Sequence, residues 1–354
     1  MASEGTIQPR CLLYDTTFTL HRLSPLYTSR DVHLDNLALS QHARRFRDII
    51  VGDVLRGVQV GLESEGSALQ RTGALQNVTW RLLSHEELWN PQDETQIAHG
   101  EEDTTTLGAS SGMLMKITYE RTAYTAILLR DIQREIEDGS ITGMDLDGDE
   151  SIYFPLLLTK MPGPLRDTFA DFLTTTFDTR ISVLRLPRTY TTTAFERYVA
   201  YVCIREDGDL MDYTESSGAL NRVVGSVVVS IGFDLPDGSS TLKTIDIKIA
   251  KPDLPGIMLR GNSLGGGADK SPFVNALTTY VKARMALDLA HERVKVMAIA
   301  CEAFSLGAEG KVKLTSPWVD NDGESPGKRS TIRLLNSLVV FAKGGTLSEG
   351  YDGP

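Results

Sequence analysis

The sequence has few cysteines and histidines, and it has no long apolar run. Its three cysteines, Cys11, Cys203 and Cys301, are far apart and form no Cys-x-x-Cys pair. This excludes a disulfide scaffold, and we expect three reduced thiols in an intracellular protein. No stretch approaches the ~20 apolar residues of a membrane helix, and residues 1–10 lack the apolar core of a secretory signal. We therefore expect no contact with a membrane.

The sequence has fewer basic than acidic residues. The chain has 36 Lys and Arg residues against 47 Asp and Glu residues, a formal net charge of −11. Such a protein repels free nucleic acid on average. Any contact with DNA must therefore come from a locally basic surface.

Length and composition indicate a globular protein with more than one core. A single core rarely organises 354 residues, and 41% hydrophobic with 23% charged residues is ordinary for a globular chain. The acidic tract Glu135–Glu150 offers little to a core and separates two groups of apolar segments. We place the boundary there, which gives an N-terminal lobe of residues 1–150 and a C-terminal lobe of residues 151–354.

Apolar periodicity predicts many strands and a few helices. Apolar residues alternate with polar ones in the expected strands, and they recur every three to four positions in the expected helices. The expected strands are 16–23, 58–62, 78–82, 113–119, 124–129, 152–159, 227–233, 245–249, 294–300 and 311–314. The expected helices are 32–51, 165–177 and 272–291, and residues 193–204 fit either type. This pattern predicts an α+β fold with two lobes of mainly antiparallel β-sheet packed with a few helices.

Three motifs resemble ligand sites but lack an essential residue. Asp145–Glu150 resembles a calcium loop, yet positions one and twelve of that loop are Gly143 and Phe154. In His85–Trp89, tryptophan stands where the second zinc-binding histidine belongs. We therefore predict no metal site and no catalytic residues.

The third motif is the glycine-rich segment Gly261–Ser271 before a predicted helix. Backbone N–H groups at a helix start attract anions, but Asp269 stands where a phosphate loop needs glycine. A linker is the better interpretation. A nucleotide- or anion-binding enzyme that uses residues 261–271 remains the alternative hypothesis for function.

Two groups of basic residues interrupt the acidic background. Arg44, Arg45 and Arg47 lie on the polar side of the first predicted helix, and Lys282, Arg284, Arg293 and Lys295 lie near a later helix and strand. The candidates for contact with the DNA backbone are Arg44, Arg45, Arg47, Arg284, Arg293 and Lys295. The competing interpretation is that these are solvated faces that balance acidic neighbours.

The last apolar segment runs from Ile332 to Ala342 between basic residues. We predict a strand, which either completes an internal sheet or forms an edge that pairs with a second chain. In the second case the partner-binding residues are Ile332, Leu334, Leu338, Val339, Val340 and Phe341, with Leu338 and Phe341 as anchors.

Several segments together resemble one known family. The sequence Phe18-Thr-Leu-His-Arg-Leu-Ser-Pro-Leu-Tyr27, directly before a predicted helix, is similar to the N-terminal signature of the centromere protein L family. Phe154–Leu158, Thr175–Asp178 with Ile181–Pro187, and the segment from Gly310 to Phe341 agree in order. Each motif is weak alone, but their order and the matching length are specific, and the resemblance covers nearly the whole chain.

The resemblance implies a non-enzymatic subunit of the inner kinetochore without a cofactor. Members of this family act in chromosome segregation in cell division, including meiosis, and reside in the nucleus at the centromere. They have curved antiparallel sheets and pair with the C-terminal domain of centromere protein N, whose N-terminal region recognises the centromeric nucleosome. The pair also lines a channel that grips DNA. In some members the C-terminal region mediates self-association, so a homodimer is a further possibility.

Overall fold

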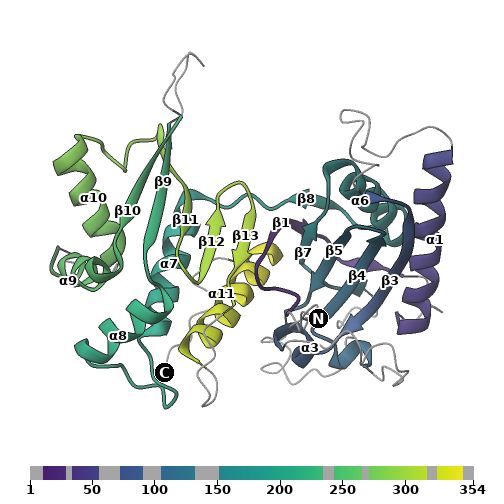
Figure 1. Cartoon of the computed structure of the whole chain (residues 1–354), viewed down its shortest axis with the longest axis horizontal. Coiled ribbons are helices and arrows are strands. Elements are labelled where there is room, and N and C mark those ends of the chain that lie inside the picture. Colours follow the sequence, from purple (N-terminus) through teal and green to yellow (C-terminus); the bar gives the residue numbers. More distant parts are fainter. Residues whose placement is uncertain are drawn as a thin grey trace, which may run out of the picture. The chain divides into compact units, whose positions relative to one another are not determined.

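The computed structural model of the chain (Figure 1) describes residues 11–28, 34–55, 72–90, 105–131, 151–233, 243–264, 271–316 and 325–345. The described residues divide into two compact units. Unit 1 comprises residues 11–14 and Phe18–Val183, and unit 2 comprises Asp15–Thr17 and the residues from Leu184 onward. The N–H of Asp15 donates to the carbonyl oxygen of Leu314 at 2.7 Å, which ties this short N-terminal piece to unit 2.

The division falls after Val183, whereas the acidic tract predicted a boundary at residue 150. The cause is strand β7 (Leu156–Lys160), which pairs with both β1 (Thr16–Leu23) and β5 (Ala123–Leu129). Residues after the acidic tract therefore complete the sheet of the first unit. The composition of the chain carries no information about this long-range strand pairing.

Unit 1 is an antiparallel sheet with the strand order β1-β7-β5-β4-β3. Strands β3 (Leu75–Leu83) and β4 (Gly112–Tyr119) follow β5, and the three-residue strand β8 (Ile181–Val183) also pairs with β1. The short strands β2 (Leu26–Tyr27) and β6 (Ser151–Ile152) form a separate pair. The predicted strands 16–23, 78–82, 113–119 and 124–129 are confirmed here. The expected strand 152–159 is divided between β6 and β7, and the expected strand 58–62 lies outside the described residues.

Two helices pack on one face of this sheet. Helix α1 (Asn36–Leu55) buries Leu39, Ala43, Phe46 and Ile50, the stripe that the sequence predicts. Helix α6 (Gly163–Phe177) contributes Phe169, Phe172 and Phe177, which surround the ring of Trp80 with centroid separations of 5.9–6.4 Å. This aromatic core fixes α6 over the sheet, and α6 carries part of the cavity described below. The short elements α3 (His85–Trp89) and η1 (Leu107–Ala109) complete the unit.

In unit 2 the antiparallel strands follow the order β10-β9-β11-β12-β13. Its strands are β9 (Val227–Phe233), β10 (Thr244–Ile249), β11 (Val294–Ala300), β12 (Phe304–Gly307) and β13 (Lys311–Leu314). Its helices are α7 (Arg188–Val202), α8 (Tyr213–Val223), α9 (Leu254–Leu264), α10 (Pro272–Met285) and α11 (Pro326–Lys343), with η2 (Lys251–Asp253) before α9. Sheets with helices in both units confirm the α+β prediction.

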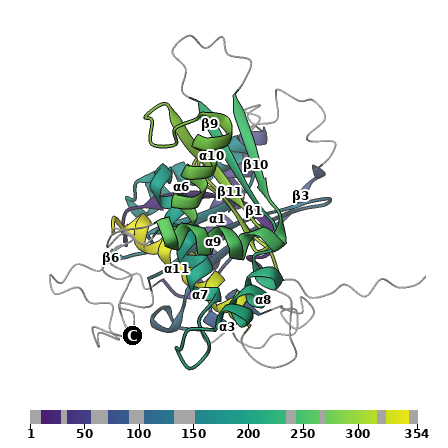
Figure 2. The ribbon, with the colours of Figure 1, turned by 90° about the vertical axis from the view of Figure 1, so that its left-hand side faces the viewer.

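Helix α9 includes the first four residues of the expected linker, 261–264. Residues 254–264 are helical, and α9 packs beside α10 in both views (Figures 1 and 2). Gly261 permits this contact, since a Cβ atom there would lie 1.7 Å from the carbonyl oxygen of Pro272. The glycine therefore serves close helix packing, because any larger residue would push the two helices apart.

Three helices of unit 2, α7, α8 and α10, differ in how well the sequence predicted them. The undecided segment 193–204 belongs to α7, whose Phe195, Tyr198 and Val199 are buried. The helix expected over residues 272–291 ends at Met285, because Ala286 adopts the left-handed region at φ 51°. Leu277 and Val281 of this helix are buried, whereas Met285 is exposed. Helix α8 was not predicted, although Asp212 and Glu215 form a capping box at its start.

Candidate functional surfaces and cavity

The C-terminal segment is a helix, α11, so the prediction of a strand at Ile332–Ala342 is wrong. Ser325 caps the start of α11, Pro326 occupies its first turn, and Gly344 ends it at φ 106°. Of the proposed contacts, Leu334, Leu338 and Val339 are buried inside unit 2. The other three proposed contact residues are half-buried: Ile332, Val340 and Phe341.

Phe341 is also engaged within the unit. Its ring packs on Tyr190 of α7 at a centroid separation of 4.6 Å. Leu338, the other proposed anchor, has no exposed surface. Neither residue therefore lies on the edge of a sheet.

The predicted basic residues lie in two different units. Arg44, Arg45 and Arg47 are exposed on α1 of unit 1, as the helical pattern predicts. Arg284 is exposed in the last turn of α10, and Arg293 and Lys295 are exposed around the start of β11. Each group is a local basic surface on its own unit.

Arg188 is a basic residue that the sequence did not single out. Its guanidinium donates to the carbonyl oxygens of His291 and Val294, at 3.3 Å and 3.2 Å. These bonds fix the turn that carries Arg293 before β11. The sequence could not predict this role of Arg188, because residues 188 and 291 are brought together only by folding.

Strand β10 offers an unpaired edge of the unit 2 sheet. The N–H of Phe233 donates to the carbonyl oxygen of Lys243, so residues 245, 247 and 249 direct their backbone groups toward β9. Thr244, Asp246 and Lys248 therefore direct theirs away from the sheet. Within the described ranges, no hydrogen bond uses these outward groups.

At β3, the last strand of the unit 1 sheet, an outward backbone group is already hydrogen-bonded. Helix α1 runs alongside β3 (Figure 1), and Asn36 Oδ1 accepts the outward N–H of Leu82 at 2.8 Å. This side-chain bond occupies an edge donor that a new strand would need. Of the two strands, β10 is therefore the better site for strand addition.

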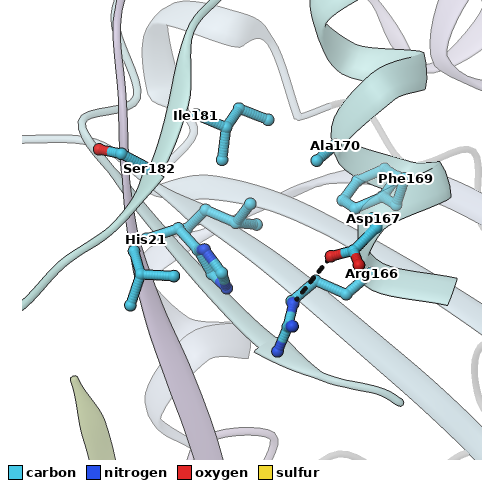
Figure 3. Close-up of a pocket in the computed structure, with 9 residues that line it drawn as sticks. His21, Arg166, Asp167, Phe169, Ala170, Ile181 and Ser182 are labelled. Atoms are coloured by element: carbon cyan, nitrogen blue, oxygen red, sulfur yellow. Dashed lines mark ion pairs between the residues drawn. The ribbon is translucent and has the colours of Figure 1, made fainter. Parts of the chain in front are cut away.

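A cavity of about 160 Å³ lies in unit 1 between the sheet and α6 (Figure 3). Its floor is a cross-strand row of Leu157, His21 and Val183, because His21 pairs with the other two residues in β7 and β8. Its other lining residues are Arg166, Asp167, Phe169 and Ala170 of α6, with Ile181 and Ser182 of β8. The strand β8 is too short to close the hollow next to α6.

His21 is 96% buried at this floor, and its hydrogen bonds define its tautomer. Its Nε2 lies 3.1 Å from Thr159 Oγ1, whose own hydroxyl donates to the carbonyl oxygen of Thr19 at 3.4 Å. The Thr159 oxygen therefore accepts from Nε2–H, which leaves a lone pair on Nδ1. Burial first and the positive charge of Arg166 second lower the pKa of His21 to about 4. The ring is thus neutral at physiological pH.

Arg166 and Asp167 form the charged side of the cavity. The Nε of Arg166 lies 3.5 Å from Asp167 Oδ1, and the guanidinium and the His21 ring point toward each other across the cavity (Figure 3). Asp167 is largely exposed, whereas the Arg166 side chain is 30% exposed. The terminal nitrogens of Arg166 have no acceptor among the residues that the structure describes.

The other predicted motifs give no ligand site in the described parts. His85–Trp89 is the short helix α3, with Glu87 paired to Arg81 at 2.6 Å. The calcium-like tract and residues 265–270 lie outside the described residues. Among the described residues, no cluster of His, Cys, Asp and Glu could hold a metal ion. In the same ranges, no helix combines the length and apolarity needed to cross a bilayer.

The comparison with known families covers almost the whole chain. The family described as CENP-L, Centromere protein L, matches residues 12–343. The chain belongs to the centromere protein L family. This confirms the resemblance and makes the protein a kinetochore subunit in a family of structural proteins, associated with the centromere in the nucleus and with chromosome segregation. No individual curated protein matches the chain.

Proposed function

We propose that this protein is a structural subunit of the inner kinetochore that pairs with the C-terminal domain of centromere protein N. The pair helps anchor the constitutive centromere-associated network at centromeric nucleosomes and DNA. The observation that carries this proposal is the family match over residues 12–343, which includes both units.

The partner contact is assigned to the outer edge of β10. Sheet extension needs a row of outward backbone donors and acceptors, and Thr244, Asp246 and Lys248 provide one. Ile247 and Ile249 on the same strand are buried, so the strand is held in register by its own core. The exposed charges of Asp246 and Lys248 discourage unspecific pairing, as charged residues on sheet edges do.

A proline at residue 248 tests this assignment with little effect on the fold. Lys248→Pro removes a backbone N–H that points away from the sheet. The hydrogen bonds from β10 to β9 are made by residues 245, 247 and 249, so they are kept. We expect at least about tenfold weaker binding to the C-terminal domain of centromere protein N, because an edge bond is lost and the next strand is displaced. Lys248→Ala is the matched control, since it removes the same side chain but keeps the N–H. Equal binding by both variants would reject the β10 edge as the contact.

A second copy of the chain is the competing occupant of the same edge. Light scattering of the isolated chain, and then of the chain with its partner, separates a homodimer from a heterodimer. We expect the partner to form a one-to-one complex. A homodimer that persists with excess partner would contradict heterodimer formation at this edge.

The contact with DNA is assigned to the exposed arginines Arg44, Arg45 and Arg47, and to Arg284, Arg293 and Lys295. Exposed guanidinium and ammonium groups bind phosphates without reading bases. Because the whole chain has a net charge of −11, we expect weak DNA binding by the isolated chain and stronger binding by the complex, in which a partner supplies further basic surface.

A further inference from the structure

The cavity beside His21 has features of a binding site that the kinetochore role does not explain. It is open between α6 and β8, and its walls are the apolar side chains of Leu157, Phe169, Ile181 and Val183. A partly desolvated guanidinium lies on one side, and a buried imidazole lies on the floor. Apolar walls around a cation strengthen its attraction to an anion, because water screens the charge less there.

Arg166 has unused capacity for hydrogen bonds. A guanidinium carries five N–H donors, and the ion pair with Asp167 engages only its Nε edge, at 3.5 Å. The two terminal nitrogens form the fork that binds the two oxygens of a carboxylate or a phosphate. Asp167 does not fill this role, because it is bound at the side of the guanidinium and is largely exposed to water.

His21 adds a group whose hydrogen-bonding role changes with protonation. In the neutral ring Nε2–H is committed to Thr159, and Nδ1 has no partner in the described part of the chain. Nδ1 of His21 is accessible to solvent, whereas Nδ1 of His42 is fully buried. Protonation turns Nδ1 into a donor for an anion in the cavity, and the charged groups that face it there are Arg166 and Asp167.

We propose that the cavity lined by His21, Arg166 and α6 is a subsite for a single oxyanion, either a carboxylate or a phosphate group. Arg166 binds the two oxygens through its terminal nitrogens, and the apolar walls weaken the screening of the pair by water. An anion there offsets the positive charge of Arg166 that disfavours protonation of His21. Binding therefore becomes tighter as the pH falls and the ring takes up a proton. The subsite is in unit 1 and is independent of the proposed pairing at β10.

The test is an NMR titration of the full chain with sodium phosphate and, separately, with sodium acetate, at ionic strength held constant with chloride. The chain has six histidines, and the His21→Gln variant identifies the His21 signal by its loss. We expect the anion to move the His21 signal saturably and to raise the measured pKa of the ring by about half a unit or more. Saturation by phosphate at lower concentration assigns a phosphate group, and saturation by acetate at lower concentration assigns a carboxylate.

Three variants separate a site from a general effect of salt. Arg166→Gln should weaken binding at least about tenfold, because it removes the guanidinium that lines the cavity. Asp167→Asn should tighten binding, since it removes the competing carboxylate. Arg180→Gln is the matched control, because Arg180 is exposed in the same unit and does not line the cavity. Chemical denaturation checks that all three remain folded.

The proposal is overturned by either of two results. The first is a His21 signal that does not respond to phosphate or acetate beyond the chloride control. The second is an equal response in the wild-type and Arg166→Gln proteins. Neither result affects the pairing with centromere protein N.

Discussion

The carboxylate of Glu196 on α7 accepts the backbone N–H of Val274 at 3.1 Å and so caps the start of α10. Ser271 directly precedes this helix, but its side chain makes no capping bond to the helix. The cap instead comes from a residue 78 positions earlier in the sequence. A carboxylate at a helix start also interacts favourably with the helix dipole.

Removal of this cap should destabilise unit 2. Glu196→Ala leaves the first N–H groups of α10 without a side-chain acceptor, and we expect a loss of about 1–3 kcal/mol in the free energy of unfolding. Glu196→Gln keeps an oxygen acceptor and should lose less. Urea denaturation measures both, and an Ala variant as stable as the Gln variant would contradict the capping role.

The pKa of the same carboxyl group is raised, first of all by its burial. A raised pKa in the folded state means that the folded chain binds the proton more tightly than the unfolded chain does. The stabilisation from this proton is complete below the pKa of an ordinary glutamate, and it is lost as the pH rises through the folded value. Glu196→Gln should remove this part of the pH dependence, as denaturation series at several pH values will show.

His21 should make the protein sensitive to acid in the opposite sense. Its pKa falls from the usual 6.5 to about 4, mainly through burial, so its contribution to stability is present above pH 6.5 and is lost as the pH falls toward 4. We expect this loss to be on the order of 2–3 kcal/mol, since one pKa unit corresponds to about 1.4 kcal/mol. The measurement is urea denaturation at pH 7 and pH 4.5 for the wild type and His21→Gln.

The histidine variant has a clear expected sign. It should be less stable than the wild type at pH 7, but its stability should fall less between the two pH values. Burial also lowers the pKa of His42, so some acid sensitivity should persist. Identical pH dependence in both proteins would contradict a neutral, buried His21.

Leu338 should act through stability instead of through direct partner contact. It is fully buried on α11, so Leu338→Ala should cost about 2–5 kcal/mol in the free energy of unfolding. Arg333→Ala is the control on the same helix, because Arg333 is exposed and lies over the Tyr201 ring at 4.1 Å. We expect it to cost less than about 1 kcal/mol. Calorimetry distinguishes the two, and comparable melting temperatures would contradict the assigned burial.

The sequence contains enough information to predict that α11 is a helix. Valine and isoleucine favour strands, and this preference misled the prediction. The spacing of Leu334, Leu335, Leu338, Val339 and Ala342 is nevertheless that of one helix face. Ser325-Pro326 before it and Gly344 after it are ordinary start and stop signals. Here periodicity and caps should have outweighed residue preference.

The cavity was beyond the reach of sequence patterns. Its floor joins His21 to Leu157, 136 positions later in the sequence, and to Val183, 162 positions later, and these residues meet only through strand pairing. By contrast, the buried stripe of α1 was predictable because it depends on spacing within one segment. The same reasoning identified Arg44, Arg45 and Arg47 as exposed, since a helix with a buried stripe exposes its remaining positions.

Those arginines should contribute to the salt dependence of DNA binding. In the complex with centromere protein N, replacement of Arg44, Arg45 and Arg47 by glutamate should reduce the slope of log K against log salt by about 2–3, at about 0.9 per phosphate contact. Arg180→Glu is the control for a charge change on the same unit. Fluorescence anisotropy with duplex DNA at several salt concentrations provides the measurement. An unchanged slope would assign the arginines to solvent.

The central claim is that this chain pairs with the C-terminal domain of centromere protein N through the outer edge of β10. Isothermal titration calorimetry of the purified full chain with that domain tests it most directly, with the wild type, Lys248→Pro and Lys248→Ala measured side by side. The account predicts a one-to-one complex for the wild type and Lys248→Ala, and at least about tenfold weaker binding for a folded Lys248→Pro. No binding by the folded wild-type chain would contradict the pairing itself, and equal binding by all three would contradict the edge.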